Sequence, residues 1–362
     1  MKQTDTDRVY IIAEAGVNHN GDRALAFALV DAAADAGADA VKFQTFDASK
    51  LASSSVAKAA YQKKSTDEAE SQLSMLKKLE LPREWHAELK SYAEAKGIDF
   101  LSTAFDTDSL DFLNTLGMPL FKVPSGELTN GPLLWKFAST GKKLVLSTGM
   151  ATLAEVEQAL AIVTHALAFT DEPKNMDEVW RYWGSREGRQ RLIGHVALLH
   201  CTSQYPTPWG EVNLRAMDTL ASAFGLEVGY SDHTEGSLIS IAAVARGARI
   251  IEKHFTLDRS MPGPDHLASL EPHELKAMVS DIRALQQALG DGVKAPQESE
   301  WDTRRAARQQ VVAARQIEQD EILTREHLTT ARSGQGMAPT ALWELVVSRA
   351  SRSYSVGENI EP

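Results

Sequence analysis

Residues 227–255, EVGYSDHTEGSLISIAAVARGARIIEKHF, contain two short apolar runs separated by a helix-like stretch. The first run leads to His233 and the second to His254. Strand, helix and strand in this order form a unit whose two strands run parallel. We therefore expect both imidazole groups at the same end of two neighbouring strands.

The same alternation of strand-like and helix-like segments extends from Val9 to about Gly290. Eight segments have strand character, namely residues 9–16, 40–45, 100–105, 120–125, 144–148, 196–202, 227–231 and 249–255. Runs with apolar residues at helical spacing lie between them, among them residues 24–36, 84–96, 152–167, 238–245 and 274–289. Eight such units predict an α/β fold, a closed (β/α)8 TIM barrel whose chemistry takes place at the C-terminal ends of its strands.

Two insertions interrupt this pattern. Residues 48–72 are polar, contain Ser and Lys, and have a length more typical of an active-site lid than of a plain connection. Residues 170–191 are charged and include Trp180 and Trp183. We expect this second insertion to decorate the fifth helix.

The chain is predicted to form two domains. Residues 290–300 have the Gly, Pro and charged composition of a linker. They separate a barrel domain, residues 1–289, from a compact tail, residues 301–362. The tail has short β-prone runs at 310–314 and 345–348.

The composition excludes several classes of protein. Hydrophobic residues make up 43% of the 362 residues, enough for a large core and a small second unit. A formal net charge of -11 with scattered lysines argues against nucleic acid and anionic membranes as partners. The sequence shows no secretory signal and no apolar stretch long enough to span a bilayer. The single cysteine, Cys201, fits a reducing compartment, so we expect a cytoplasmic protein.

The two histidines indicate a metal site. Neutral imidazole groups suit a borderline divalent ion such as Mn2+, Zn2+ or Co2+. Asp232, Glu252 or Glu14 could add ligands or fix the histidine tautomers. A lone histidine at a barrel rim more often satisfies a hydrogen bond, but His233 and His254 on adjacent strand ends favour a metal.

Polar residues that follow the other strands predict an anion site beside the metal. Lys42 and Gln44 share one face of their strand, and a buried lysine is unfavourable unless an anion meets it. Together with Lys122 and several hydroxyl groups, they suit a phosphate or carboxylate. Pairing of the lysines with interior carboxylates is the alternative. The residues expected at this mouth are Glu14, Lys42, Gln44, Thr103, Lys122, Ser125, Ser147, His200, His233 and His254.

These residues lie in motifs that resemble the phosphoenolpyruvate-condensing sialic acid synthases, or N-acetylneuraminate synthases. The matching barrel segments are IIAEAGVNHNGD (11–22), AGADAVKFQTF (36–46), KVPSGELTN (122–130), LSTGM (146–150), LLHCTSQYPTP (198–208), GYSDHT (229–234) and IEKHFTLD (251–258). The tail segments VVAARQI (311–317), EHLTTAR (326–332) and GQGMAP (334–339) resemble the antifreeze-like (SAF) domain of that family. The resemblance covers nearly the whole chain.

The resemblance also implies roles for individual residues. His233 and His254 would bind a divalent metal, usually Mn2+, with Mg2+ or Co2+ as alternatives. The residues implied around phosphoenolpyruvate are Lys42, Thr103, Lys122, Ser125, Ser147 and Ser231. Those implied at the sugar and the reaction centre are Glu14, Gln44, Tyr205 and Asp265, with Glu127 in proton handling. Arg332 would reach a sugar bound in the partner subunit of a domain-swapped homodimer.

The implied reaction joins phosphoenolpyruvate to N-acetylmannosamine or a related acetamido hexose, giving a nine-carbon 2-keto acid and phosphate. Three departures from the family pattern, Ala306, Ser333 and Ser203, leave the sugar open. The same chemistry on 2,4-diacetamido-2,4,6-trideoxymannose would make the chain an N,N'-diacetyllegionaminate synthase. A metal-dependent pyruvate aldolase and a non-catalytic sugar-binding protein are alternatives of other classes.

Overall fold

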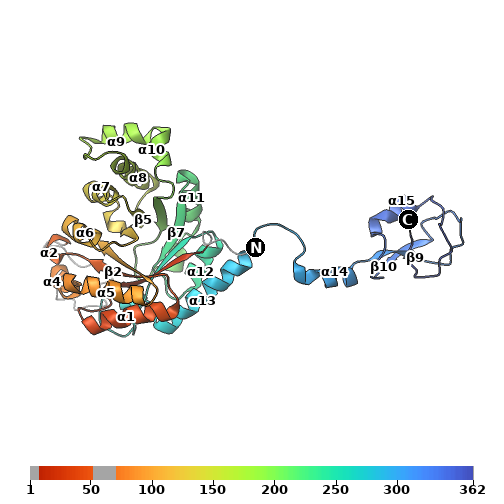
Figure 1. Ribbon diagram of the computed structural model, residues 1–362, viewed down its shortest axis with the longest axis horizontal. Helices are drawn as coiled ribbons and strands as arrows, with labels where there is room; N and C mark the ends of the chain where they lie inside the picture. The colour runs from red at the N-terminus through yellow and green to blue at the C-terminus, as the bar shows by residue number, and fades with distance from the viewer. Residues whose placement is uncertain (1–7, 52–70, 362) are drawn as a thin grey trace. The chain divides into compact units, whose positions relative to one another are not determined.

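The computed structural model describes residues 8–51 and 71–361. The chain divides into two compact units, residues 1–290 and 291–362. The first unit is a barrel of eight parallel strands surrounded by helices (Figure 1). The predicted (β/α)8 barrel is therefore confirmed.

The barrel strands follow one another in order around the ring. Their bounds are β1 (Tyr10–Gly16), β2 (Ala40–Thr45), β3 (Asp99–Ala104), β4 (Leu120–Val123), β5 (Lys143–Ser147), β6 (Val196–His200), β7 (Glu227–Asp232) and β8 (Ile250–His254). The sheet order is β3-β2-β1-β8-β7-β6-β5-β4, so β8 returns to β1, while β3 and β4 lie side by side where the ring closes. Each predicted strand is present, with ends that differ by no more than two residues.

Helices follow the strands and cover the outside of the barrel. Their bounds are α1 (Arg23–Ala36), α2 (Ala48–Leu51), α4 (Gln72–Leu79), α5 (Arg83–Ala95), α6 (Thr107–Asn114), α7 (Gly131–Ser139), α8 (Leu153–Ala168), α9 (Met176–Trp183), α10 (Arg186–Gln190), α11 (Arg215–Phe224), α12 (Leu238–Ala245) and α13 (Pro272–Leu289). The five predicted helices are confirmed as α1, α5, α8, α12 and α13. The sequence pattern does not single out α6, α7 and α11, which are short and mix polar with apolar residues, whereas the similarly short α12 is apolar at every position except Ser240.

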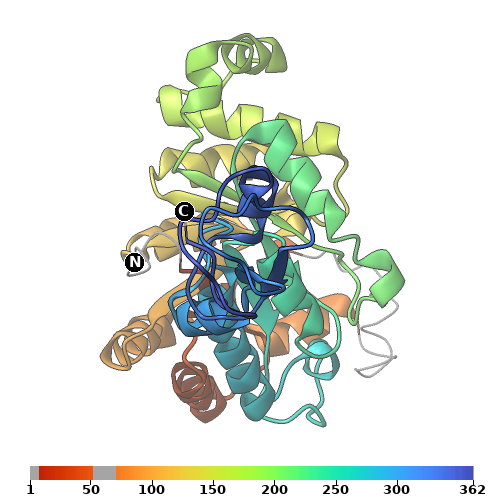
Figure 2. The ribbon, with the colours of Figure 1, turned by 90° about the vertical axis from the view of Figure 1, so that its right-hand side faces the viewer.

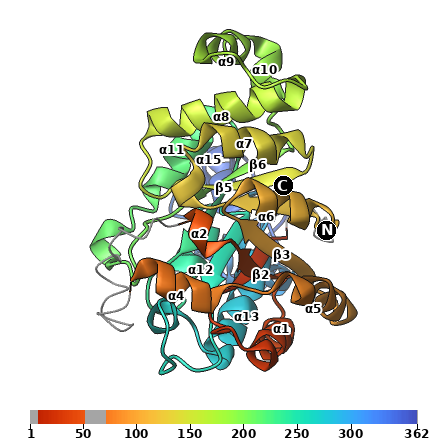
Figure 3. The same cartoon turned by 90° about the vertical axis from the view of Figure 1, so that its left-hand side faces the viewer.

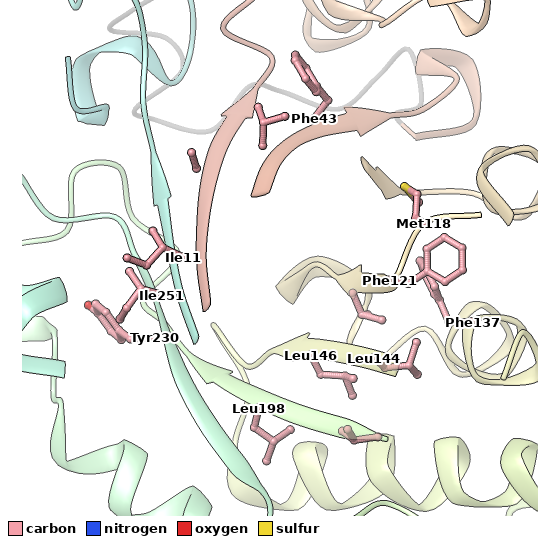
Figure 4. Packing of buried hydrophobic residues seen from close by; sticks show 14 of the residues in the cluster. Ile11, Phe43, Met118, Phe121, Phe137, Leu144, Leu146, Leu198, Tyr230 and Ile251 are labelled. Atoms are coloured by element: carbon pink, nitrogen blue, oxygen red, sulfur yellow. The ribbon is translucent and has the colours of Figure 1, made fainter. Parts of the chain in front are cut away.

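Two apolar layers hold the barrel, one on each face of its strands. The inner layer, inside the ring, contains Ile12, Ala40, Leu101, Val145, Leu199 and Ile250. The outer layer packs against the helices, and Figure 4 shows from it Ile11, Phe43, Phe121, Leu146, Leu198 and Ile251. Successive side chains of a strand point to opposite faces, so the polar residue two positions after an inner apolar residue also points inward, at the carboxyl end of the strand. We call this end of the ring the barrel mouth.

The insertion at residues 170–191 packs as predicted. It forms α9 and α10, which lie outside α8 (Figures 2 and 3). Val179 is buried in the outer layer, and Trp183 donates a hydrogen bond from Nε1 to Glu157 Oε1 at 2.9 Å. Of the expected lid at residues 48–72, the structure describes α2 and the first residues of α4, and the rest lies outside the described residues.

The second unit has a small core of its own. Its antiparallel strands are β9 (Gln310–Ala313) and β10 (Leu328–Ala331), and its helices are α14 (Trp301–Ala307) and α15 (Leu342–Leu345). The buried side chains include Val311, Ile317, Leu323, Tyr354 and Ile360.

The β-prone runs of the tail were predicted with mixed success. The run at 310–314 is confirmed as β9, but the prediction of a strand at 345–348 is wrong. That run begins with Leu345, the last residue of α15, and Val347 has a positive φ of 74°, which an extended strand does not allow. No helix in the described parts of either unit is long and apolar enough to cross a membrane.

Candidate active site

The barrel mouth brings together charged residues from neighbouring strands. Glu14 on β1 lies opposite Lys42 on one side and His254 on the other in the parallel register. Gln44 lies opposite Thr103 in the same way. Gly16 ends β1 with a positive φ of 54°, and a Cβ there would contact Glu14, Gln44 and His254 at 3.4 Å. The predicted convergence of these residues is therefore present.

Lys42 is the buried centre of one half of the site. Its Nζ lies 2.6 Å from Glu14 Oε2 and 3.4 Å from Glu252 Oε2, and it donates a hydrogen bond to Thr103 Oγ1 at 3.1 Å. Gln44 Nε2 is 3.3 Å from the other Glu14 oxygen. The sequence left open that the lysines pair with interior carboxylates. The structure shows such a pairing for Lys42, whose buried ammonium group contacts two carboxylates.

Glu252 connects the two lysines. Its Oε1 lies 3.1 Å from Lys122 Nζ and accepts a hydrogen bond from Ser231 Oγ at 2.8 Å, while its Oε2 faces Lys42. The sequence suggested Glu252 as a metal ligand or a tautomer-fixing group. The structure instead places it between two ammonium groups. It is the residue whose role the sequence reasoning missed, because spacing places it on the inner face but does not reveal its partners.

The surroundings of Glu252, Glu14 and Asp265 shift the pKa values of their carboxyl groups in different directions. Burial acts to raise the pKa of Glu252, but Lys122 and Lys42 outweigh it, and the net pKa lies below its ordinary value. Burial raises the pKa of Glu14 despite the opposing charge of Lys42. Burial, with the nearby charge of Glu14, raises the pKa of Asp265 to about 7. Glu252 is therefore the ionised partner of the lysines, whereas Asp265 is suited to carry a proton at neutral pH.

The charge on Lys42 follows from the same contacts. Burial alone would lower the pKa of its ammonium group, yet Glu14 and Glu252 outweigh that effect and raise the pKa. Lys42 therefore stays charged although it is almost completely buried. A cation held in this way can bind a substrate anion without first being protonated.

Three aromatic rings lie beside this network. The centroids of His233 and His254 are 5.6 Å apart, and the ring of Tyr205 is 4.1 Å from His233 and 5.6 Å from His254. His233 Nδ1 lies 2.7 Å from the carbonyl oxygen of Thr202 and donates to it in the neutral tautomer. This bond leaves the Nε2 lone pair directed toward Ser231, at 3.4 Å.

The two imidazole groups fit a divalent metal. Burial lowers the pKa of His233 to about 4 and that of His254 well below its ordinary value, so both rings are neutral at pH 7 and can donate a lone pair. His254 Nδ1 is buried and has no hydrogen-bond partner within residues 8–51 and 71–361. Across those same ranges no three His, Cys, Asp or Glu side chains converge on one point. The protein therefore offers two imidazole ligands, and water or substrate oxygens would complete the shell.

A group of small polar residues forms another part of the mouth. Ser125 Oγ accepts a hydrogen bond from the backbone N–H of Gly149 at 3.0 Å and lies 3.1 Å from Cys201 Sγ. A Cβ on Gly149 would come within 2.4 Å of Ser203 Oγ, so no larger residue fits there. The hydroxyl of Ser147 is buried and makes no hydrogen bond to any described residue. It is therefore available to a ligand.

Three further predicted positions are Glu127, Arg332 and His200. Glu127 is half-buried in the turn after β4, where its carboxylate accepts a hydrogen bond from Asn130 Nδ2 at 2.7 Å. Arg332 is exposed and follows β10 in the second unit. The expectation that His200 points into the mouth is wrong. His200 follows the inner residue Leu199, so alternation turns it outward, where it contacts Val212 O at 2.7 Å and the ring of Tyr230.

The loop after β8 places Asp265 at the site. Asp265 is buried, and its backbone oxygen accepts a hydrogen bond from Ser269 Oγ at 2.7 Å. Asn18, in the loop after β1, donates to Ser269 Oγ at 3.0 Å and to the backbone oxygen of Phe255 at 2.8 Å. The loops after β1 and β8 are thereby joined, and the loop that carries Asp265 is held against the mouth.

Comparison with known proteins identifies relatives of this chain. Residues 29–294 match the family model described as the NeuB family. The chain is 48% identical over 353 residues to the N,N'-diacetyllegionaminic acid synthase of Campylobacter jejuni, which covers 98% of this chain and 99% of that protein. It is 46% identical over 351 residues to the N,N'-diacetyllegionaminic acid synthase of Legionella pneumophila, with 97% and 93% covered.

A solved structure agrees with these relatives. The N-acetylneuraminic acid (sialic acid) synthetase of Leptospira borgpetersenii serovar Hardjo-bovis, in complex with citrate, is 34% identical to this chain. The two structures superpose with a TM-score of 0.66 over 82% of this chain and 90% of that chain. The resemblance that the sequence motifs carry is confirmed by both kinds of comparison.

Proposed function

The chain belongs to the NeuB family of phosphoenolpyruvate-dependent sugar-acid synthases, and from this premise we propose that it joins phosphoenolpyruvate to 2,4-diacetamido-2,4,6-trideoxymannose. The products would be N,N'-diacetyllegionaminic acid and phosphate. The observation that carries this proposal is the identity of 48% and 46% to two N,N'-diacetyllegionaminic acid synthases, against 34% to the sialic acid synthetase of known structure. The comparisons favour this sugar over N-acetylmannosamine, which the sequence alone put first.

A competition between sugars tests the proposal. With the purified protein, Mn2+ and phosphoenolpyruvate, we expect kcat/KM for the diacetamido trideoxy sugar to exceed that for N-acetylmannosamine by at least about tenfold. N-acetylmannosamine has a hydroxyl in place of the second amide, and protein groups that bind this amide would lose their hydrogen-bond partner. Phosphate release and the mass of the sugar acid are the measurements. Equal or better use of N-acetylmannosamine would contradict the choice of sugar, and activity with pyruvate in place of phosphoenolpyruvate would contradict the reaction.

Two lysines and the surrounding hydroxyl groups support a phosphoenolpyruvate pocket. Lys42 and Lys122 are buried ammonium groups whose charges Glu252 partly offsets. A dianionic phosphate or a carboxylate would form charge-assisted hydrogen bonds with them, stronger than bonds between neutral groups. Ser147, with its unpartnered hydroxyl, adds a neutral donor. These groups would bind the donor substrate and orient its enol carbon.

We assign the divalent metal to His233 and His254. When bound there, Mn2+ would act as a Lewis acid on the aldehyde oxygen of the open-chain sugar. The ring of Tyr205 lies against both imidazole rings and would exclude water from one side of the site.

Glu14 and Asp265 are the proton carriers that the structure favours. Carbon–carbon bond formation turns the aldehyde oxygen into a hydroxyl group, which needs one proton. Water that adds to C2 must lose a proton before phosphate leaves with C–O cleavage. The pKa of about 7 lets Asp265 donate and accept a proton near neutral pH, and the raised pKa of Glu14 makes that carboxylate a better proton acceptor than an ordinary glutamate. A role of Glu127 in proton transfer, which the family resemblance implies, stays a prediction. Its carboxylate accepts a hydrogen bond from Asn130.

We further propose a homodimer in which the second unit of each chain covers the mouth of its partner. Exposed apolar side chains follow four successive strands, namely Met150, Trp209, Leu238 and Leu267. The second unit also exposes Trp343 and Val347. Exposed apolar surface of this kind is typical of protein–protein contacts.

We also propose a cytoplasmic location. The single cysteine is buried and free, and the proposed donor substrate, phosphoenolpyruvate, is a metabolite.

The proposed dimer predicts an effect of Arg332. We expect Arg332→Ala to raise KM for the sugar by about tenfold, the loss expected for one hydrogen bond from a charged group, while KM for phosphoenolpyruvate stays unchanged. Steady-state kinetics with each substrate varied in turn provides the measurement. Arg305→Ala, on the exposed face of α14, is the matched control and should change neither constant. An unchanged KM for the sugar in Arg332→Ala would exclude the swapped arrangement.

A further inference from the structure

A fully buried ion pair lies behind the two histidines, on the outer face of β7 and β8. Lys253 Nζ is 3.2 Å from Asp232 Oδ2, and both side chains are shielded from solvent. The two residues lie opposite each other in the parallel register. Each is the chain neighbour of one histidine, so alternation sends the ion pair outward and the imidazole groups of His233 and His254 inward.

The ion pair is part of a hydrogen-bonded network that encloses His233 from both sides. Asp232 Oδ1 accepts hydrogen bonds from the backbone N–H and the hydroxyl of Thr234, both at 2.8 Å. Asp232 Oδ2 accepts from Ser240 Oγ on α12 at 2.6 Å. Lys253 Nζ donates to the backbone oxygen of Thr234 at 2.5 Å. The residues before and after His233 are thus both tied to the strand that carries His254.

Stability alone is a poor explanation for this network. Removing two charges from water is unfavourable, and a well-packed apolar pair in the same place is often as stable as a buried ion pair. Unlike apolar packing, the ion pair makes directional hydrogen bonds. Asp232 accepts from the backbone N–H of Thr234 and Lys253 donates to its carbonyl oxygen, which fixes the backbone just after β7. Groups that hydrogen-bond to metal-binding histidines orient the rings and set metal affinity, and this network acts one step further out, on the backbone beside His233.

We propose that Asp232 and Lys253 are positioning residues, which hold His233 and His254 at the separation that binds a divalent metal. The proposal rests on the metal site proposed above. Neither residue touches substrate or metal. Their effect passes through the backbone of Thr234 and through the adjoining ends of β7 and β8.

The test uses the full-length protein with both charges removed, Asp232→Asn with Lys253→Met, so that no lone charge stays buried. We expect the Kd for Mn2+ alone, measured by calorimetry or by the paramagnetic signal of free Mn2+, to rise about 10- to 100-fold. KM for phosphoenolpyruvate should not change. Wild-type Mn2+ affinity in a folded double variant would overturn the proposal.

A milder variant covers the case in which the double variant does not fold. Ser240→Ala removes one hydroxyl that donates to Asp232 and leaves both charges in place. We expect its Kd for Mn2+ to rise by about three- to tenfold, less than for a bond made to the metal site itself, because Ser240 acts only through Asp232. An unchanged Kd in Ser240→Ala would count against the network even without the double variant.

A second ion pair gives the matched control. Arg283 on α13 contacts Asp39 at 2.6 Å, before β2 and hence at the opposite end of the barrel. Arg283→Met should lower the melting temperature and leave the Kd for Mn2+ unchanged. A weakening of Mn2+ binding by Arg283→Met equal to that of the double variant would mean general destabilisation and refute the positioning role.

The metal assignment itself has a separate outcome. If His233→Ala binds Mn2+ as tightly as the wild type, the proposed metal site fails. If His233→Ala loses Mn2+ while the Asp232→Asn, Lys253→Met variant keeps it, only the positioning role fails.

Discussion

His233→Ala and His254→Ala are each expected to lower kcat/KM by at least roughly a thousandfold, because a Lewis acid supplies several kcal/mol to the transition state and about 1.4 kcal/mol corresponds to a factor of ten. Each variant should also fail to gain activity from added Mn2+. Phosphate release measured over a range of Mn2+ concentrations checks both statements. Chelator-treated wild-type protein should show the same loss and recover with Mn2+.

A third histidine provides the matched control for these variants. His200 also ends a barrel strand, but its ring faces outward and contacts Val212 O and Tyr230. His200→Gln retains a polar group there and should keep wild-type metal dependence. Full activity of His233→Ala in the presence of chelator would refute the metal assignment, whatever the behaviour of His200→Gln.

Lys122→Met should have the second largest effect. We expect the Kd for phosphoenolpyruvate to rise by about 10- to 100-fold, because a charge-assisted hydrogen bond is worth about 1.5–3 kcal/mol. Lys122 is a better choice than Lys42 for this test. Without Lys122, Glu252 still has Lys42 and Ser231 as partners, whereas removal of Lys42 leaves Glu14 without its counter-ion. Isothermal titration with phosphoenolpyruvate measures the change directly.

The control for Lys122→Met is a lysine outside the mouth. Lys136 on α7 is partly exposed and pairs with Asp111 at 2.9 Å. Lys136→Met should bind phosphoenolpyruvate as the wild type does, since an exposed ion pair contributes little. Wild-type affinity in Lys122→Met would show that the two lysines pair only with the interior carboxylates and form no anion pocket.

The sequence predicts the barrel well because its signals are local. Each strand is a short apolar run that ends in polar residues, so the strand ends agree within two residues. The longer helices show a clear 3.6-residue period and the short α12 is almost wholly apolar, whereas α6, α7 and α11 are short and mix polar with apolar residues. The run at residues 345–348 has β-prone composition, but Val347 has a positive φ and its backbone N–H donates to Leu323 O, a contact that composition does not record.

The site was predictable only in part, for a geometric reason. Register and alternation place Glu14, Lys42 and His254 on one inner face, and this could be read from spacing. His200 ends a strand, but its side chain faces outward because Leu199 before it faces inward, and the position of a strand end alone does not reveal this. The bridging role of Glu252 depends on distances between four strands, which no local pattern contains.

The central claim is that a metal held by His233 and His254 lies beside an anion bound by Lys42 and Lys122. Anomalous diffraction from crystals grown with Mn2+ and phosphoenolpyruvate tests it most directly. The account predicts one Mn2+ peak within coordination distance of both imidazole groups, and density for the phosphate or carboxylate in contact with both ammonium groups. Mn2+ bound elsewhere, or phosphoenolpyruvate bound away from the two lysines, would contradict it.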